Sequence, residues 1–129
     1  MRLHHVGLAV ADLGAAVDLY RTALGAELER EGRSQTEDME YALMRTGDSE
    51  LELMHSSDPE SPVGKFLSKR GPGVHHVAFE VDDLAAELDR LRGAGYEIVG
   101  DVRTGVHGTR VAFVHPRSMG GVLTELVEK

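Results

Sequence analysis

The chain has 129 residues, of which 41% are hydrophobic and 28% are charged, and its formal net charge is -8. This length suits one compact domain, so we expect one domain to carry the whole function. The acidic balance argues against a nucleic-acid surface, which needs clustered Lys and Arg. No apolar run approaches the roughly 20 residues that a membrane helix requires, so no membrane partner is expected either.

The chain contains no cysteine. Disulfides, thiolate nucleophiles and cysteine-ligated zinc are therefore excluded, and any metal must be held by histidine and carboxylate side chains. The first residues resemble a strand and lack the charged, apolar and small-residue regions of a signal peptide. A cytoplasmic location is the resulting expectation.

The first half begins with an alternating strand and continues into an amphipathic helix. Asp12 is a suitable N-cap for this helix and Gly25 a suitable stop. Sequence rich in strand formers follows and ends in a strand that carries Glu52. The predicted apolar stripe of the helix consists of Leu13, Val17, Tyr20 and Leu24.

Residues 57–72 read as a linker that contains a short helix. Ser61 is its expected N-cap, Pro62 its first residue and Gly71 its end.

The second half repeats the first. Residues 3–13 align with 74–84 at a shift of 71 positions, with both His, two Val, an Asp and a Leu in common. Residues 49–54 resemble 122–127 at a shift of 73. The second helix is expected between Asp83 and Gly95, with an apolar stripe of Leu84, Leu88 and Leu91. The duplication predicts two β-α-β-β-β modules, at about 1–56 and 73–129.

Each module places one His and one Glu on a matching strand position. Successive strand residues point to opposite faces, so His4 and His5 are separated, and so are His75 and His76. His5 and His76 share their faces with small residues, whereas His4 and His75 share theirs with large apolar ones and are expected to pack. Glu52 and Glu125 are likewise separated from neighbouring leucines.

Two imidazoles and two carboxylates form an N/O ligand set that suits a first-row divalent ion. We therefore predict a metal site made of His5, Glu52, His76 and Glu125. The alternative is that these are ordinary strand histidines and solvated glutamates. The repetition of all four in two copies favours the metal site. A glycine-rich loop at 105–108 is expected to border it, and His55, His107 and His115, which lack symmetry partners, are expected in loops or at the rim.

Three stretches carry a resemblance to a known family: residues 4–10, residues 61–82 and residues 111–126. They resemble the vicinal oxygen chelate superfamily and, within it, most closely the methylmalonyl-CoA epimerases. The Ser-Pro helix and the His-Pro-Arg-Ser-x-Gly-Gly-Val-Leu segment are the most specific parts. The resemblance implies an α+β, glyoxalase-like fold in which the two modules form a curved mixed sheet around a divalent ion. That ion is expected to be cobalt, with manganese, nickel and zinc as alternatives, and a homodimer is implied as well.

The implied reaction is metal-dependent inversion at C2 of an acyl-CoA through a stabilised enolate. The resemblance places Glu125 beside the reacting carbon as a proton carrier as well as a ligand. Some epimerases carry a glutamate on the second strand of the first module, where this chain has Tyr41 preceded by Glu40. A one-residue shift changes the face. Tyr41, Glu40 through a bulge, or a water could carry the second proton, and Tyr41 could also be only a strand aromatic.

The phosphates of an acyl-CoA substrate require positive charge on this acidic chain. Lys65, Lys69 and Arg70 on the linker helix, and Arg117 with Ser118 near the last strand, are the candidates. A solvated helix face would show the same lysine spacing.

Two rival functions remain open. A glyoxalase I-type lactoylglutathione lyase, or another metal enzyme of the fold, would share the metal site. The linker helix and the Arg117–Gly121 segment favour the epimerase over it. The second rival is a non-catalytic small-molecule-binding resistance protein, and the complete set of four ligands argues against it.

Overall fold

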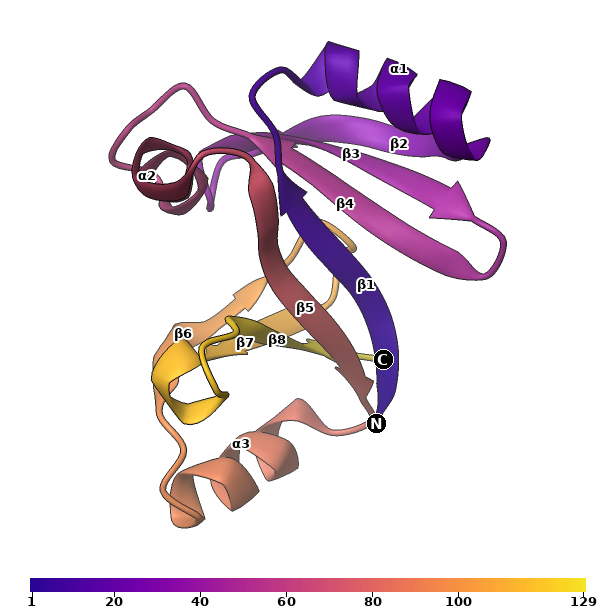
Figure 1. The fold of residues 1–129 in the computed structure, drawn as a ribbon. Coiled ribbons are helices and arrows are strands. Elements are labelled where there is room, and N and C mark those ends of the chain that lie inside the picture. The colour runs from indigo at the N-terminus through magenta and orange to yellow at the C-terminus, as the bar shows by residue number, and fades with distance from the viewer. The chain divides into compact units, whose positions relative to one another are not determined.

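The structure is a computed structural model that describes all 129 residues and contains three α-helices, one 3₁₀ helix and eight strands (Figure 1). The chain divides into two compact units. The N-terminal unit comprises His5–His75, and the C-terminal unit comprises Met1–His4 together with His76–Lys129. No helix is long and apolar enough to cross a membrane.

The N-terminal unit holds most of β1 and the elements up to the start of β5. Its strands are ordered β2-β3-β4-β1. Neighbours are antiparallel except for β1 and β4, which run parallel, so the sheet is mixed. The elements are β1 (Arg2–Ala9), α1 (Leu13–Leu24), β2 (Glu27–Ser34), β3 (Met39–Thr46), β4 (Ser49–His55) and α2 (Pro62–Arg70).

Both helices of this unit begin and end where the sequence predicts. Asp12 accepts a hydrogen bond from the N–H of Ala15 at 2.9 Å, and Gly25 ends α1 with a left-handed φ of 67°. Ser61 caps α2 by accepting from the N–H of Gly64 at 3.0 Å, and the helix ends before Gly71. These caps satisfy N–H groups that the first turn leaves without helical partners.

Helix α1 packs on one face of β2, β3 and β4 (Figure 1). The predicted stripe is right at Val17, which is buried, and at Leu13 and Tyr20, which pack at the edge of the cluster. It is wrong at Leu24, which is 61% exposed. Leu24 lies in the last turn, and the small Ala16 takes a core position instead. The buried cluster consists of Ala16, Val17, Ala26, Ala42, Met44 and Leu53.

The C-terminal unit repeats this plan. Its strands are ordered β5-β8-β7-β6, with β5 and β8 parallel and the other neighbours antiparallel. The prediction of two β-α-β-β-β modules is therefore confirmed. The elements are β5 (Gly73–Val81), α3 (Leu84–Gly93), β6 (Ile98–Thr104), β7 (Arg110–Val114), the 3₁₀ helix η1 (Pro116–Ser118) and β8 (Thr124–Glu128).

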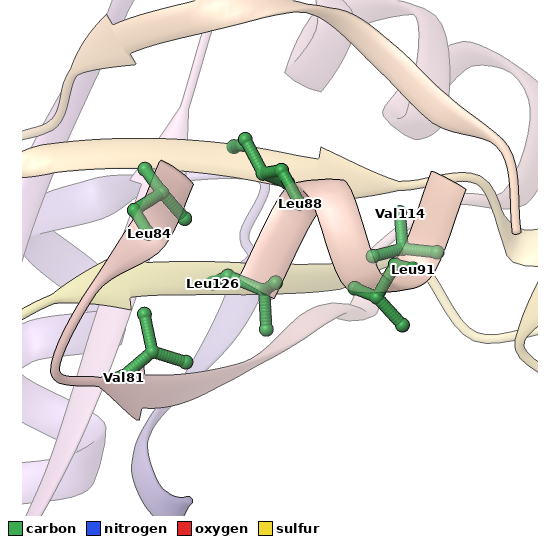
Figure 2. Close-up of a cluster of buried hydrophobic side chains, with 7 residues drawn as sticks. Val81, Leu84, Leu88, Leu91, Val114 and Leu126 are labelled. Carbon is green, nitrogen blue, oxygen red and sulfur yellow. The ribbon is translucent and has the colours of Figure 1, made fainter. Parts of the chain in front are cut away.

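Helix α3 begins after Asp83, as predicted, and covers one face of β7 and β8. Leu84, Leu88 and Leu91 form its buried stripe, which Figure 2 shows against Val114 and Leu126. Full burial of a side chain of this size stabilises the fold by about 1.5–3 kcal/mol. Each unit thus has a helix-covered face of its sheet and an opposite face, and the opposite face carries the candidate site.

Candidate metal and substrate site

The N-terminal unit brings His5 and Glu52 together. Strands β1 and β4 run parallel with Gly7 opposite Glu52, and His5 lies two residues before Gly7 on the same face. The His5 Nε2 atom is 3.4 Å from a carboxylate oxygen of Glu52. Only 2% of His5 and 4% of Glu52 is exposed, so both side chains are removed from water.

The C-terminal unit holds an equivalent pair, His76 and Glu125. Ala78 lies opposite Glu125 in the parallel pairing of β5 with β8, and His76 is two residues earlier. The His76 Nε2 atom is 2.9 Å from a carboxylate oxygen of Glu125, and the two residues are 3% and 6% exposed. The pair thus repeats the strands, the spacing and the burial of His5 and Glu52.

Both glutamates face away from the helices. Leu53 and Leu126, which directly follow them, belong to the clusters under α1 and α3. Because side chains alternate along a strand, Glu52 and Glu125 must each project from the face of their sheet that is not covered by a helix, as the sequence predicts.

These pairs have the chemistry of a metal site. A buried carboxylate is costly unless a partner or an ion compensates its charge. Each of the four residues offers one ligand atom, an imidazole nitrogen or a carboxylate oxygen. Such donors suit first-row divalent ions, and the small Gly7 and Ala78 beside the glutamates leave space near them. The residues present therefore fit the metal that the sequence predicts.

The remaining histidines have other surroundings. His4 and His75 are half-buried, and their rings lie edge-to-face against His107 at 4.8 Å and Phe66 at 5.1 Å. His107 lies in the predicted loop between β6 and β7. His55, expected in a loop or at the rim, is the last residue of β4, where its Nδ1 is 2.9 Å from the carbonyl oxygen of Val10.

Tyr41 and Glu40 project to opposite faces of β3. Leu43 lies opposite Glu52, so Tyr41, two residues before Leu43, shares the face of Glu52. Glu40 lies opposite His55 and is exposed on the other face. The pairing of β3 with β4 is unbroken from Glu40 to Thr46, so the bulge that would turn Glu40 inward is not present.

The Tyr41 hydroxyl lies over Gly32 in the neighbouring strand. A Cβ atom added to Gly32 would come within 2.8 Å of the phenol oxygen, so glycine makes room for the ring. The Arg30 guanidinium lies 5.9 Å from the centre of the same ring.

Four of the predicted phosphate-binding residues are exposed, and the fifth, Ser118, is half-buried. Lys65 and Lys69 lie on the solvent side of α2, where Arg70 stacks on the Phe66 ring at 5.6 Å. Arg117 binds both carboxylate oxygens of Glu97, at 2.9 and 3.2 Å. The Ser118 hydroxyl accepts a hydrogen bond from the N–H of Glu97 at 3.0 Å.

Two residues on the Glu125 face were not predicted from the sequence. Phe113 lies directly opposite Glu125, and its ring meets His76 edge-to-face at 5.9 Å. Arg103 of β6 lies over that ring, with its Cζ 5.2 Å from the ring centre. Gly100 inside a strand-like run is the signal that could have indicated a bulge before Arg103.

Comparison with known proteins finds close relatives over nearly the whole chain. The ethylmalonyl-CoA/methylmalonyl-CoA epimerase of Cereibacter sphaeroides is 38% identical over 97% of this chain and 96% of its own. The crystal structure of methylmalonyl-CoA epimerase from Mycobacterium tuberculosis has a TM-score of 0.93 and 41% identity, covering 98% of this chain and 87% of that one.

A methylmalonyl-CoA epimerase solved in complex with methylmalonyl-CoA and NH4+ has a TM-score of 0.95 and 36% identity, covering 99% of this chain and 94% of that one. The profile of the glyoxalase/bleomycin resistance protein/dioxygenase superfamily matches residues 4–113. With these matches and the duplicated β-α-β-β-β architecture, the chain belongs to the glyoxalase/bleomycin resistance protein/dioxygenase superfamily.

Proposed function

We propose that this chain is an isomerase that interconverts the two configurations at C2 of methylmalonyl-CoA. One group removes the C2 proton from one side of the carbon, and another returns a proton from the other side. The observation that carries this proposal is the similarity, over nearly the full length, to epimerases that include one solved with methylmalonyl-CoA. The acyl-CoA substrate class follows from the same similarity.

His5, Glu52, His76 and Glu125 would together hold one divalent ion, with cobalt as the first candidate and manganese, nickel or zinc as alternatives. The duplication supports this, because each unit supplies one buried histidine and one buried glutamate from equivalent strands. When bound, the ion would supply a Lewis acid that stabilises negative charge on the substrate oxygens. The strands hold the four side chains in place, and burial keeps their donor atoms from water.

Glu125 would carry the proton on one side of C2. Its carboxylate is buried, and one of its oxygens is 2.9 Å from Nε2 of His76, which fixes its orientation. A carboxylate held in this way can accept a proton from carbon when that proton is acidified by a neighbouring thioester. The metal-ligand role and the proton-transfer role of Glu125 are both parts of the proposal.

Tyr41 would carry the proton on the other side, directly or through a water. It shares the face of Glu52, whereas Glu40 is exposed on the opposite face of the same strand. A phenol can donate a proton to carbon and be restored from solvent. Of the two residues that the sequence offers, the register therefore favours Tyr41 over Glu40.

Lys65, Lys69 and Arg70 on α2 would meet the phosphates of coenzyme A. Their exposure suits contact with a highly charged ligand, because a solvated cation needs little rearrangement to bind phosphate. Arg117 and Ser118 are weaker candidates, because both are engaged by Glu97. Binding through Arg117 would require a phosphate to compete with that carboxylate.

The proposal includes three properties of the whole chain. Both units act as one catalytic domain, because neither contains more than one His–Glu pair of this kind. The chain forms a homodimer, as the resemblance to the epimerases implies. Its location is cytoplasmic.

The test is proton NMR of methylmalonyl-CoA in deuterated water with cobalt-loaded protein, together with chiral analysis of the product. Loss of the C2 proton signal and formation of the opposite epimer are expected, and both should stop when the metal is removed. No exchange with cobalt, manganese, nickel or zinc would reject the proposal. Turnover of the hemithioacetal of glutathione and methylglyoxal would then identify the lyase.

A further inference from the structure

Arg103 lies on the face of the C-terminal unit that carries His76 and Glu125. It is opposite Val111 in β7, and Val111 is opposite Val127 in β8. Val127 lies two residues after Glu125, so all three positions project from the same face. A third buried residue on this face, Ala78, packs with Val111 and Val127.

A bulge in β6 directs Arg103. Val99 pairs with Phe113 and Arg103 with Val111, so β6 has three residues between these pairs where β7 has one. Gly100 begins the extra segment with a left-handed φ of 65°, a conformation that favours glycine. Bulges bend an edge strand and change the direction of the side chain that follows.

The aromatic ring of Phe113 connects Arg103 to the predicted metal ligand. The Arg103 Cζ is 5.2 Å from the ring centre, and the ring meets the His76 imidazole edge-to-face at 5.9 Å. The Arg103 Nε atom is buried, and the residue as a whole is half-buried. One face of this unit thus carries four neighbouring groups in order: the Arg103 guanidinium, the Phe113 ring, the His76 imidazole and the Glu125 carboxylate.

Three other arginines of this unit form ion pairs with carboxylates at the surface. Arg90 pairs with Glu87, Arg110 with Glu128 and Arg117 with Glu97. Their side chains are between 55% and 70% exposed. Arg103 differs from all three because it lies half-buried on the site face.

We propose that Arg103 receives the free carboxylate of the substrate's acyl group. A guanidinium binds a carboxylate through two parallel N–H donors, which fixes the carboxylate plane as well as its position. This carboxylate is attached to C2, so holding it would orient the C2–H bond toward Glu125. Phe113 would keep the guanidinium in place by stacking. The inference rests on the proposed function and adds to it the group that recognises the malonyl carboxylate.

The test compares a ligand that has this carboxylate with one that lacks it. In cobalt-loaded protein, KM is measured for methylmalonyl-CoA, and Ki is measured for propionyl-CoA as a competitive inhibitor. Arg103→Gln should raise KM by about ten- to a hundred-fold, the loss expected for a charged hydrogen-bond pair, and leave Ki nearly unchanged. Arg90→Gln, on the exposed face of α3, is the control and should alter neither constant.

If Arg103 has a purely structural role, its replacement should raise KM and Ki together. If it has no role, both constants should stay unchanged. Either result overturns the assignment. If Arg103→Gln does not fold, Arg103→Lys retains a charge without the two-pronged geometry, and KM should still rise more than Ki. An equal rise in that variant would also contradict the inference. Failure of the wild-type protein to exchange the C2 proton would reject the proposed function itself. Normal wild-type exchange with an unchanged ratio of KM to Ki in the variant rejects only the role of Arg103.

Discussion

At the scale of single residues, the two His–Glu pairs were predictable because they depend on side-chain alternation and on the repeat. The next residue on the same face is small in both strands, Gly7 after His5 and Ala78 after His76, and the structure places both histidines on the faces away from the helices. Arg103 was not predictable in this way. Its direction depends on a bulge, and alternation does not show where a strand gains residues.

Replacing Glu125 by Gln tests the proton-transfer role of this residue. The amide cannot accept a proton at neutral pH, so the rate of C2 proton exchange should fall by about a hundred- to ten-thousand-fold. Exchange is followed by NMR while metal content is measured on the same sample. Glu31→Gln, an exposed change on β2, is the control. Full activity of Glu125→Gln at normal metal loading would exclude Glu125 as a proton carrier.

Replacing Tyr41 by Phe separates exchange from inversion. Without the phenol, Glu125 can still remove a proton and return a deuteron to the same side of C2. We therefore expect Tyr41→Phe to exchange the C2 proton at a substantial rate but to form the opposite epimer at least about ten-fold more slowly. NMR in deuterated water and chiral analysis measure the two rates. Unchanged inversion would assign the second proton to a water or another group.

At the scale of elements, helix boundaries were predictable because capping residues act locally. Asp12, Ser61 and Asp83 each accept a hydrogen bond from the first turn, as their side chains and positions indicate. The exposure of Leu24 was not predictable, because a helical stripe does not show where the sheet beneath it ends. Tertiary packing, and not helical spacing, decided which turn of α1 is buried.

The start of α2 depends on a close approach at Gly64. A Cβ atom there would be 1.8 Å from the carbonyl oxygen of Asp58, so Gly64→Ala must shift the backbone. We expect a loss of about 1–3 kcal/mol in the free energy of unfolding, measured by urea denaturation. Gly93→Ala is the matched control at the end of α3, where a Cβ meets nothing within 4 Å. Equal stability of the two variants would show that α2 can adjust without cost.

Glu128 joins the end of β8 to the start of α3. Its carboxylate accepts hydrogen bonds from Arg110 at 2.9 Å and from the N–H of Leu84 at 3.0 Å. The Arg110 guanidinium, followed by the Leu84 N–H, lowers the pKa of Glu128 below its usual value. Because the folded pKa is depressed, the stabilisation is complete above the unfolded pKa of about 4.3 and is lost as the pH falls through the folded pKa.

Glu128→Gln should therefore reduce the unfolding temperature at pH 7 but cause a progressively smaller reduction below about pH 4. Thermal unfolding at a series of pH values measures this difference. Arg110→Gln should show the same trend, since it removes the main cause of the lowered pKa. A difference that stays constant down to pH 2 would show that Glu128 acts through its shape and not through its charge.

At the scale of the whole molecule, the duplication has the largest consequence. Each unit holds one buried imidazole and one buried carboxylate, which is half of the proposed set of four ligands. If the two halves serve one ion, catalysis requires both units, and the chain acts as one domain. The fold of each unit and the composition of each pair could be predicted from the repeat, but the register and the bulges required the structure.

The measurement that tests this account most directly is a cobalt titration of metal-free protein with C2 proton exchange of methylmalonyl-CoA followed by NMR. Exchange should rise in proportion to added cobalt and reach its maximum at one ion per chain. Alanine at either His5 or His76 should abolish tight binding of that ion. A maximum at two ions per chain would contradict the shared site, and absence of exchange at every cobalt level would contradict the metal-dependent epimerase.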